Sequence, residues 1–184
     1  KFQKKHNNLL YFLLLCCFFT THHIMFNTKK FNEIKDFLKK SNNKAKIVAI
    51  SKNHPIESVL EAIKSGVYIF GENRVQEAAQ KYPELKATHP ELTIHLIGPL
   101  QTNKVREAVN LFDVIETLDR PKLAQALAKE RDRVGRCPEV FIQINTGQEP
   151  QKSGIDPLMA DEFIKKVREE FQLPLTGLMC IPPA

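Results

Sequence analysis

Short apolar runs alternate with longer amphipathic segments over most of the chain, and this alternation limits the fold more than any other feature. Six runs have the length and β-branched character of strands, at residues 46–51, 67–70, 92–97, 113–116, 139–145 and 175–179. Strands that alternate with helices of about 10–15 residues are typical of βαβ units and a parallel sheet. The sequence therefore predicts an α/β fold, either an open doubly wound sheet or a (β/α)8 barrel.

The segments between these runs have the apolar spacing of helices. Proline and glycine give several expected boundaries: Pro55 opens a helix that Gly66 closes, and Pro83 is expected to end a helix that starts at Val75, since proline interrupts the hydrogen bonding of a helix interior. The remaining helices are expected at residues 31–38, 105–112, 121–130 and 157–171. No Gly-x-Gly-x-x-Gly motif follows the first strand, which counts against the doubly wound dinucleotide-binding fold.

Residues 1–24 differ from the rest of the chain. They contain three lysines, no acidic residue and an apolar run at residues 9–19. That run is about half the length that a helix needs to span a bilayer, but it resembles the basic and apolar regions of a signal peptide. No small-residue cleavage site follows it, and the chain begins with Lys1. We interpret residues 1–24 as an extension outside the domain, with Met25 as the start of the protein; an export signal or anchor is the alternative.

The charge of the chain does not indicate a nucleic-acid-binding protein. The formal net charge is +6, but without residues 1–24 it is only +3. The four cysteines include an adjacent pair and two isolated residues, a pattern that fits neither a disulfide framework nor a zinc site. Residues 25–184 therefore predict an ordinary globular protein, for which we expect no membrane segment and no metal.

Polar residues recur where the predicted strands end. Lys52 follows the first strand, Asn73 the second, Gln101 the third and Asn145 the fifth. The carboxyl ends of parallel strands lie at one edge of the sheet, where active-site residues gather in barrels and open α/β folds. Turn residues are polar in any loop, but four such loops favour a binding site at this edge.

Lys52 is the most informative of these residues. A lysine directly after an apolar strand can lose part of its hydration, and a neutral amine reacts with carbonyl groups to form a Schiff base. The alternative is a solvated lysine on a surface loop, which describes most lysines of this chain.

Several motifs that occur in order along the chain are similar to those of the pyridoxal-phosphate homeostasis family (YggS/PROSC). They extend over almost all of residues 25–184 and lie at residues 47–52, 70–77, 95–104, 143–154 and 177–183. The resemblance implies a TIM-like (β/α)8 barrel related to the N-terminal domain of alanine racemases. It also implies pyridoxal 5′-phosphate (PLP) as the cofactor.

The resemblance also implies roles for individual residues. Lys52 occupies the position of the Schiff-base lysine, and Asn73 matches an asparagine expected near the cofactor ring. His95, Met179 and Lys152 match further motif positions, so cofactor binding is predicted for them as well. Other interpretations stay open: His95 as a hydrogen-bonded interior residue, Met179 as a core residue, and Lys152 as either a phosphate contact or a loop cap.

The number of predicted strands indicates whether the chain contains a whole barrel. A full barrel has eight βα units and about 250 residues, and its phosphate site is commonly built by the loops after strands seven and eight. With 184 residues and six predicted strands, the chain is expected to be a barrel truncated after about the sixth strand. We expect the phosphate-binding residues to lie beyond Ala184.

The resemblance predicts a monomeric cytoplasmic protein that holds PLP on Lys52 without turning over a substrate, and that has PLP-dependent apo-enzymes as partners. The first alternative is a PLP-dependent racemase-like enzyme whose second domain is missing from this chain. Another is a barrel enzyme that acts on a phosphorylated sugar through a Schiff-base lysine. In such enzymes the lysine is expected on a late strand as often as on the first, which disfavours this alternative here.

Overall fold

The structure is a computed structural model that describes residues 19–20, 23–41 and 45–181. Its strands and helices alternate as the sequence predicts. In chain order they are β1 (Phe19–Thr20), β2 (His23–Phe26), α1 (Thr28–Lys40), β3 (Ala49–Ile50), α2 (Ile56–Lys64), β4 (Ile69–Glu72), α3 (Val75–Thr88), β5 (Thr93–Leu96), the 3-10 turn η1 (Thr102–Lys104), α4 (Val105–Leu111), β6 (Val114–Leu118), α5 (Pro121–Val134), β7 (Glu139–Ile144), the 3-10 turn η2 (Pro157–Met159), α6 (Ala160–Glu169) and β8 (Leu175–Cys180).

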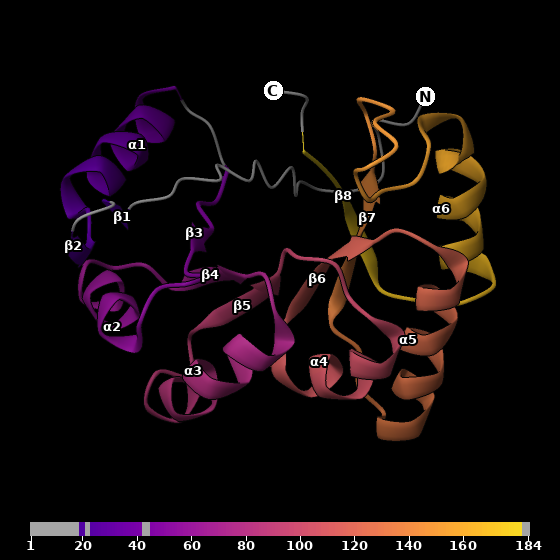
Figure 1. The fold of residues 1–184 in the computed structure, drawn as a ribbon, viewed down its shortest axis with the longest axis horizontal. Coiled ribbons are helices and arrows are strands. Elements are labelled where there is room, and N and C mark those ends of the chain that lie inside the picture. The colour runs from indigo at the N-terminus through magenta and orange to yellow at the C-terminus, as the bar shows by residue number, and fades with distance from the viewer. Residues whose placement is uncertain (1–18, 21–22, 42–44, 182–184) are drawn as a thin grey trace.

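Six parallel strands form one sheet in the order β3-β4-β5-β6-β7-β8, so each strand pairs with the next in the chain. The row of strands is curved, with α3, α4, α5 and α6 along its outer side (Figure 1). A doubly wound sheet reverses its strand order at a switch point, whereas a barrel adds its strands in sequence. The order therefore confirms the barrel-type architecture, present here as an open sheet of six described strands.

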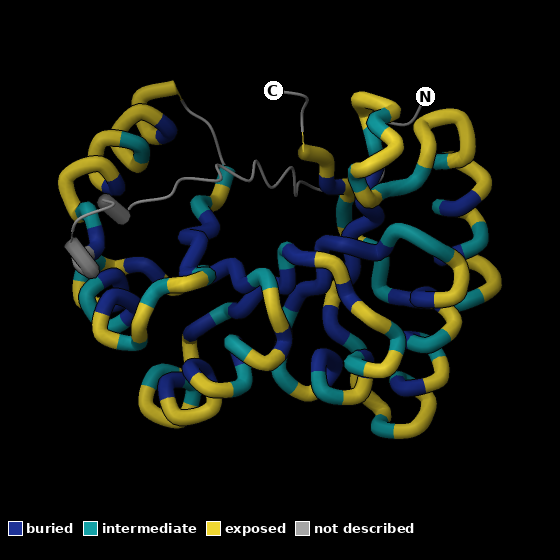
Figure 2. The backbone as a smooth tube through the Cα atoms, viewed as in Figure 1, coloured by how far each residue is buried: buried dark blue, intermediate teal, exposed yellow. Residues whose placement is uncertain are grey.

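The main core lies between the outer side of the sheet and the helices. Phe70 on β4 packs against Tyr82 on α3, with 6.0 Å between the ring centroids. Buried residues follow the strands and the helix faces turned toward them, and exposed residues cover the outer helix faces (Figure 2). Because side chains alternate along a strand, Gly71 and its register partner His95 face the opposite, inner side. Val114, Phe141 and Met179 form a second, smaller buried cluster.

The expectation that Pro83 ends a helix is wrong, because α3 continues to Thr88. A proline in a helix interior costs about 3 kcal/mol. Tyr82 and Leu85, on either side of it, are both buried against the core, and Pro83 itself faces solvent. Burying a large apolar side chain stabilises the fold by about 1.5–3 kcal/mol, so the burial of these two side chains offsets that cost.

The second strand also extends further than expected. The sequence predicts a strand at residues 67–70 that ends before Gly71, but β4 runs through Glu72. A Cβ atom at Gly71 would lie 2.9 Å from Cδ1 of Ile50 and 3.2 Å from Cγ1 of Val48. Gly71 thus permits close packing on the inner side of the sheet, and this packing is visible only in three dimensions.

At the N-terminal end of the described residues, β1 and β2 pair in antiparallel fashion. β2 crosses the predicted boundary at Met25, since it begins at His23. Phe26 is buried, its ring centroid lies 5.6 Å from that of Phe31, and its N–H donates to Oε2 of Glu61 at 3.0 Å. The apolar run at residues 9–19 lies outside the described residues except for Phe19. The assignment of residues 1–24 to an extension stays a prediction.

Within the described part of the chain, no helix is both long and apolar enough to cross a membrane.

Candidate functional site

The carboxyl ends of the six parallel strands meet at one edge, and two cavities open there. We name the smaller one, of about 200 Å³, the mouth cavity and the larger one, of about 760 Å³, the rim cavity. The mouth cavity is lined by Asn73, Ile97, Pro99, Gln143, Ile144, Asn145, Lys152, Ser153 and Ile181. The rim cavity shares Asn73, Pro99 and Ser153 with it and continues over Arg74, Val75, Gln76, Leu100, Gln101, Lys104, Asp119 and Arg120. Both cavities thus belong to the edge that the sequence predicts.

Lys52 lies at the same edge, in the turn that follows β3. It is partly exposed and lines neither cavity. Its ammonium group makes no hydrogen bond or ion pair with any residue that the structure describes. The next residue, Asn53, has a positive φ of 60°, which an asparagine tolerates better than most residues. Lys52 is therefore an unpaired amine on a sharply turned backbone.

A buried polar cluster holds the residue before Lys52. The hydroxyl of Ser51 donates to Oε1 of Glu72 at 2.8 Å and lies 2.6 Å from the hydroxyl of Tyr82. Nζ of Lys81 donates to the same Glu72 oxygen at 3.0 Å. Burial raises the pKa of Glu72, although the charge of Lys81 acts in the opposite direction. Burial also raises the pKa of Tyr82 well above its ordinary value, and the carboxylate of Glu72 adds to the effect.

Asn73 is placed at the mouth by the end of β4 and by Gly98. A Cβ atom on Gly98 would lie 2.1 Å from both the backbone oxygen and Oδ1 of Asn73. Only a residue without a side chain fits at this position. As Asn73 also lines both cavities, its amide is available to a molecule at the mouth.

His95 lies deeper, on the inner side of the sheet. Its Nδ1 atom is 2.5 Å from Oε1 of Glu116, and both side chains are buried. His95 lines neither cavity, and this position agrees with the interpretation of a hydrogen-bonded interior histidine. A role for His95 in cofactor binding stays a prediction.

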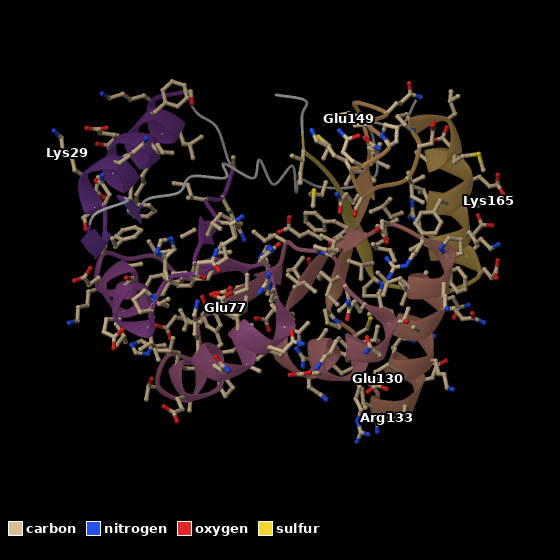
Figure 3. All side chains as sticks on the ribbon, viewed as in Figure 1. Lys29, Glu77, Glu130, Arg133, Glu149 and Lys165 are labelled. Carbon is tan, nitrogen blue, oxygen red and sulfur yellow. The ribbon has the colours of Figure 1, made fainter. Side chains whose placement is uncertain are left out.

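Met179 and Lys152 occupy different layers of the site. Met179 is buried with Val114 and Phe141 inside the sheet, as a core residue would be. Lys152 lines the mouth cavity, and its Nζ lies 2.5 Å from Oε1 of Glu149. The backbone of Glu149 is held in turn by the side-chain amide of Asn145, which donates to the Glu149 backbone oxygen at 2.8 Å and accepts from its N–H at 3.2 Å. Figure 3 shows Glu149 on the loop that follows β7.

The structure therefore brings Asn73 and Lys152 to one cavity and Lys52 to the same edge, while His95 and Met179 lie beneath it. Sequence reasoning missed the basic side of the rim cavity, formed by Arg74, Lys104 and Arg120. Arg120 pairs with Asp119 and donates to the backbone oxygen of Leu100 at 2.7 Å. Arg74 and Arg120 each lie two residues after a strand end, so the rule that found Lys52 could have found these two.

Sequence reasoning also missed Glu72, Glu77, Lys81 and Tyr82. Glu77 and Lys81 are four residues apart on a predicted helix, a spacing at which side chains meet, but nothing in the sequence shows that they reach the Lys52 turn. Among the described residues no group of three His, Cys, Asp or Glu side chains is arranged to hold a metal ion.

A sequential parallel sheet with helices on its outer side, and with polar residues at its carboxyl edge, defines a protein of the (β/α)-barrel class. The chain belongs to the family described as alanine racemase, N-terminal domain, which matches residues 28–184.

Relatives within this family carry the name pyridoxal phosphate homeostasis protein, in agreement with the motifs in the sequence. The protein of that name from Vibrio cholerae serotype O1 is 40% identical over 146 residues, which are 78% of this chain and 61% of the relative. The Escherichia coli K12 protein is 42% identical over 139 residues, which are 74% of this chain and 58% of the relative. The chain thus spans about three fifths of the length of these curated relatives.

Solved structures agree with this assignment. PipY of Synechococcus elongatus PCC7942 with PLP bound is 35% identical, with a TM-score of 0.75 over 88% of this chain and 71% of PipY. PipY without PLP has a TM-score of 0.76 at 37% identity, over 85% of this chain and 71% of PipY. An alanine racemase of Clostridium difficile 630 has a TM-score of 0.68 at 19% identity, over 86% of this chain and 41% of the racemase, and shows a likeness of fold alone.

Proposed function

We propose that this chain binds PLP through the amine of Lys52 and serves in PLP homeostasis, holding the cofactor without turning over a substrate. The observation that carries the proposal is the unpaired amine of Lys52 at the carboxyl edge of a barrel-type sheet. The relatives named for PLP homeostasis and the PLP-bound structure of PipY support it.

The residues at the carboxyl edge of the sheet suit the chemistry of this cofactor. PLP supplies an aldehyde that condenses with an amine, an aromatic ring that withdraws electrons, and a phosphate. Lys52 offers the amine, and Asn73 offers an amide at the same edge of the sheet. Ile97 and Ile181 give the mouth cavity apolar walls for a ring. Lys152 offers a cation, which Glu149 partly neutralises.

The absence of turnover is a separate part of the proposal. General acid-base catalysis requires a proton-transferring group within hydrogen-bond reach of the reacting atoms. His95 and Glu116 could transfer protons, but they are bonded to each other and buried below the mouth. This arrangement supports a carrier. Transfer of PLP to PLP-dependent apo-enzymes, a monomeric state and a cytoplasmic location remain predictions.

The test is to incubate the protein with PLP, reduce with borohydride and map the adduct by peptide mass spectrometry. The proposal expects a pyridoxyl group on Lys52 that disappears in Lys52→Arg, while the exposed Lys64 serves as a reference for random labelling. Lys52 labelled no more than Lys64 would contradict it.

A PLP-dependent racemase-like enzyme is the second candidate, favoured by the family match over residues 28–184. Circular dichroism of L-alanine incubated with the protein and PLP separates the two candidates. A steady loss of the signal identifies a racemase, and a constant signal alongside a labelled Lys52 identifies a carrier.

A further inference from the structure

The two peptide groups that flank Lys52 are both held by side chains of α3. The backbone carbonyl of Ser51, which belongs to the peptide group before Lys52, accepts a hydrogen bond from Nζ of Lys81 at 2.8 Å. The backbone N–H of Asn53, which belongs to the peptide group after Lys52, donates to Oε1 of Glu77 at 2.5 Å. Glu77 belongs to α3, and its side chain lies on the side of this helix toward β4 (Figure 3).

The two holding side chains are joined to each other. Nζ of Lys81 lies 2.6 Å from Oε1 of Glu77, the same oxygen that accepts from Asn53. The chain of contacts from Ser51 through Lys81 and Glu77 to Asn53 therefore forms a closed ring around the backbone of Lys52. We call this ring the Lys52 clamp.

The clamp is anchored in the core on one side. Lys81 also pairs with Glu72 at 3.0 Å, and the side-chain exposures of these residues are 10% and 0%. Hydrogen bonds to charged groups are stronger than neutral ones, and removal of one partner from a buried pair leaves an uncompensated charge. The anchoring groups thus resist displacement, and the turn that they hold resists it too.

A surface loop does not need such an arrangement. Here the charged side chains of Glu77 and Lys81 bind the backbone of one turn, and the buried carboxylate of Glu72 supports Lys81. The residue between the two held peptide groups is the unpaired Lys52. Lysine has a long flexible side chain, so the reach of its amine depends on the direction in which the backbone projects it. Holding a reacting group in position raises its reactivity.

We infer that Glu77 and Lys81 are positioning residues for Lys52, which fix its backbone so that the amine meets the aldehyde of PLP. This inference rests on the proposed function, because it assigns these residues a part in the reaction of Lys52. Neither residue needs to touch the cofactor, because both act through the peptide groups on each side of Lys52.

The test compares variants of two ion pairs on the same helix. Lys81→Met and Glu77→Ala each remove one side of the clamp. Lys86→Met removes a partly buried ion pair with Asp113, whose Nζ-to-Oδ2 distance is 2.7 Å, in the last turn of α3. The initial rate of pyridoxyl labelling at Lys52 is measured at one PLP concentration, with the midpoint of urea unfolding for each variant and amide hydrogen exchange at Asn53.

We expect labelling of Lys52 to fall by about tenfold in both clamp variants, the equivalent of one charge-assisted hydrogen bond, and to stay near wild type in Lys86→Met. Exchange at the Asn53 amide should become faster in Glu77→Ala but not in Lys86→Met. Glu77→Gln keeps an oxygen that can accept from Asn53, and we expect it to restore labelling to within about threefold of wild type.

The outcomes separate this inference from the proposed function. Labelling of Lys52 at the wild-type rate in folded Glu77→Ala overturns the inference and leaves PLP binding intact. Equal losses of Lys52 labelling in Glu77→Gln and Glu77→Ala also overturn the inference, because the side-chain oxygen that Glu77→Gln keeps would then have no effect. An unlabelled Lys52 in the unmodified protein overturns the proposed function and the inference together. If Lys81→Met does not fold, the two Glu77 variants decide the question.

Discussion

Nδ1 of His95 and Oε1 of Glu116 are 2.5 Å apart on the inner side of the sheet, and both side chains are buried. β5 and β6 place them on neighbouring strands, where His95 pairs in register with Val114. The second carboxylate oxygen of Glu116 has no hydrogen-bond partner among the described residues.

Replacement of this carboxylate should destabilise the protein. Glu116→Ala removes a charged hydrogen-bond partner of a buried imidazole, so we expect the free energy of unfolding to fall by about 2–3 kcal/mol, measured by urea denaturation. The exposed Glu162 serves as a control, since Glu162→Ala should change the free energy of unfolding by less than about 0.5 kcal/mol. Equal effects of the two substitutions would show that the buried pair contributes nothing to stability.

Gly98 should tolerate no side chain. In Gly98→Ala the new Cβ would overlap with backbone and side-chain atoms of Asn73, so either the strand end or Asn73 must move. We expect a loss of about 1–3 kcal/mol in urea unfolding. In Gly147→Ala the nearest atom, at 2.8 Å, belongs to the flexible carboxylate of Glu149, and the substitution should have little effect. A stable Gly98→Ala protein with unchanged PLP labelling would contradict the role given to Gly98.

Cys137 should resist alkylation, whereas Cys180 should react. Burial raises the pKa of the Cys137 thiol from 9.0 to about 11, while Cys180 is exposed. A rise of this size leaves about a hundredfold less reactive thiolate near pH 8. Iodoacetamide labelling resolved by peptide mass spectrometry checks this, and modification of both thiols at the same rate would contradict it.

The same thiol predicts a loss of stability in alkali. Its pKa is higher in the folded than in the unfolded state, so the unfolded state releases its proton first as the pH rises. The contribution of Cys137 is therefore fully present below pH 9 and is lost between pH 9 and about 11. Between pH 9 and about 11, the free energy of unfolding measured in urea should fall less in Cys137→Ala than in the unmodified protein.

Pro83 should be replaceable with a gain in stability. It lies exposed in the interior of α3, where it lacks the N–H that would bond the preceding turn. Pro83→Ala restores that donor, and after the added entropy of the unfolded chain we expect a gain of about 1–2 kcal/mol in the free energy of unfolding. Far-ultraviolet circular dichroism should show no loss of helix, and a lower unfolding midpoint would contradict this interpretation.

The motifs and the strand-helix alternation were enough to place Lys52 and Asn73 at one sheet edge, because parallel strands all deliver their carboxyl ends to the same side. That inference needs only the local pattern of the chain. The extent of the elements was harder to predict. Pro83 and Gly71 have the local character of chain breakers, and both lie inside regular elements because packing against distant residues outweighs that preference.

The sequence by itself determined the α/β class, the family and the amine that the proposed function uses. Only the tertiary structure decided which buried groups surround that amine. Glu77 and Lys81 are more than twenty residues from the turn that they hold, and His95 lies about as far from Glu116. Contacts at such separations depend on strand register and helix packing, which local residue preferences do not contain.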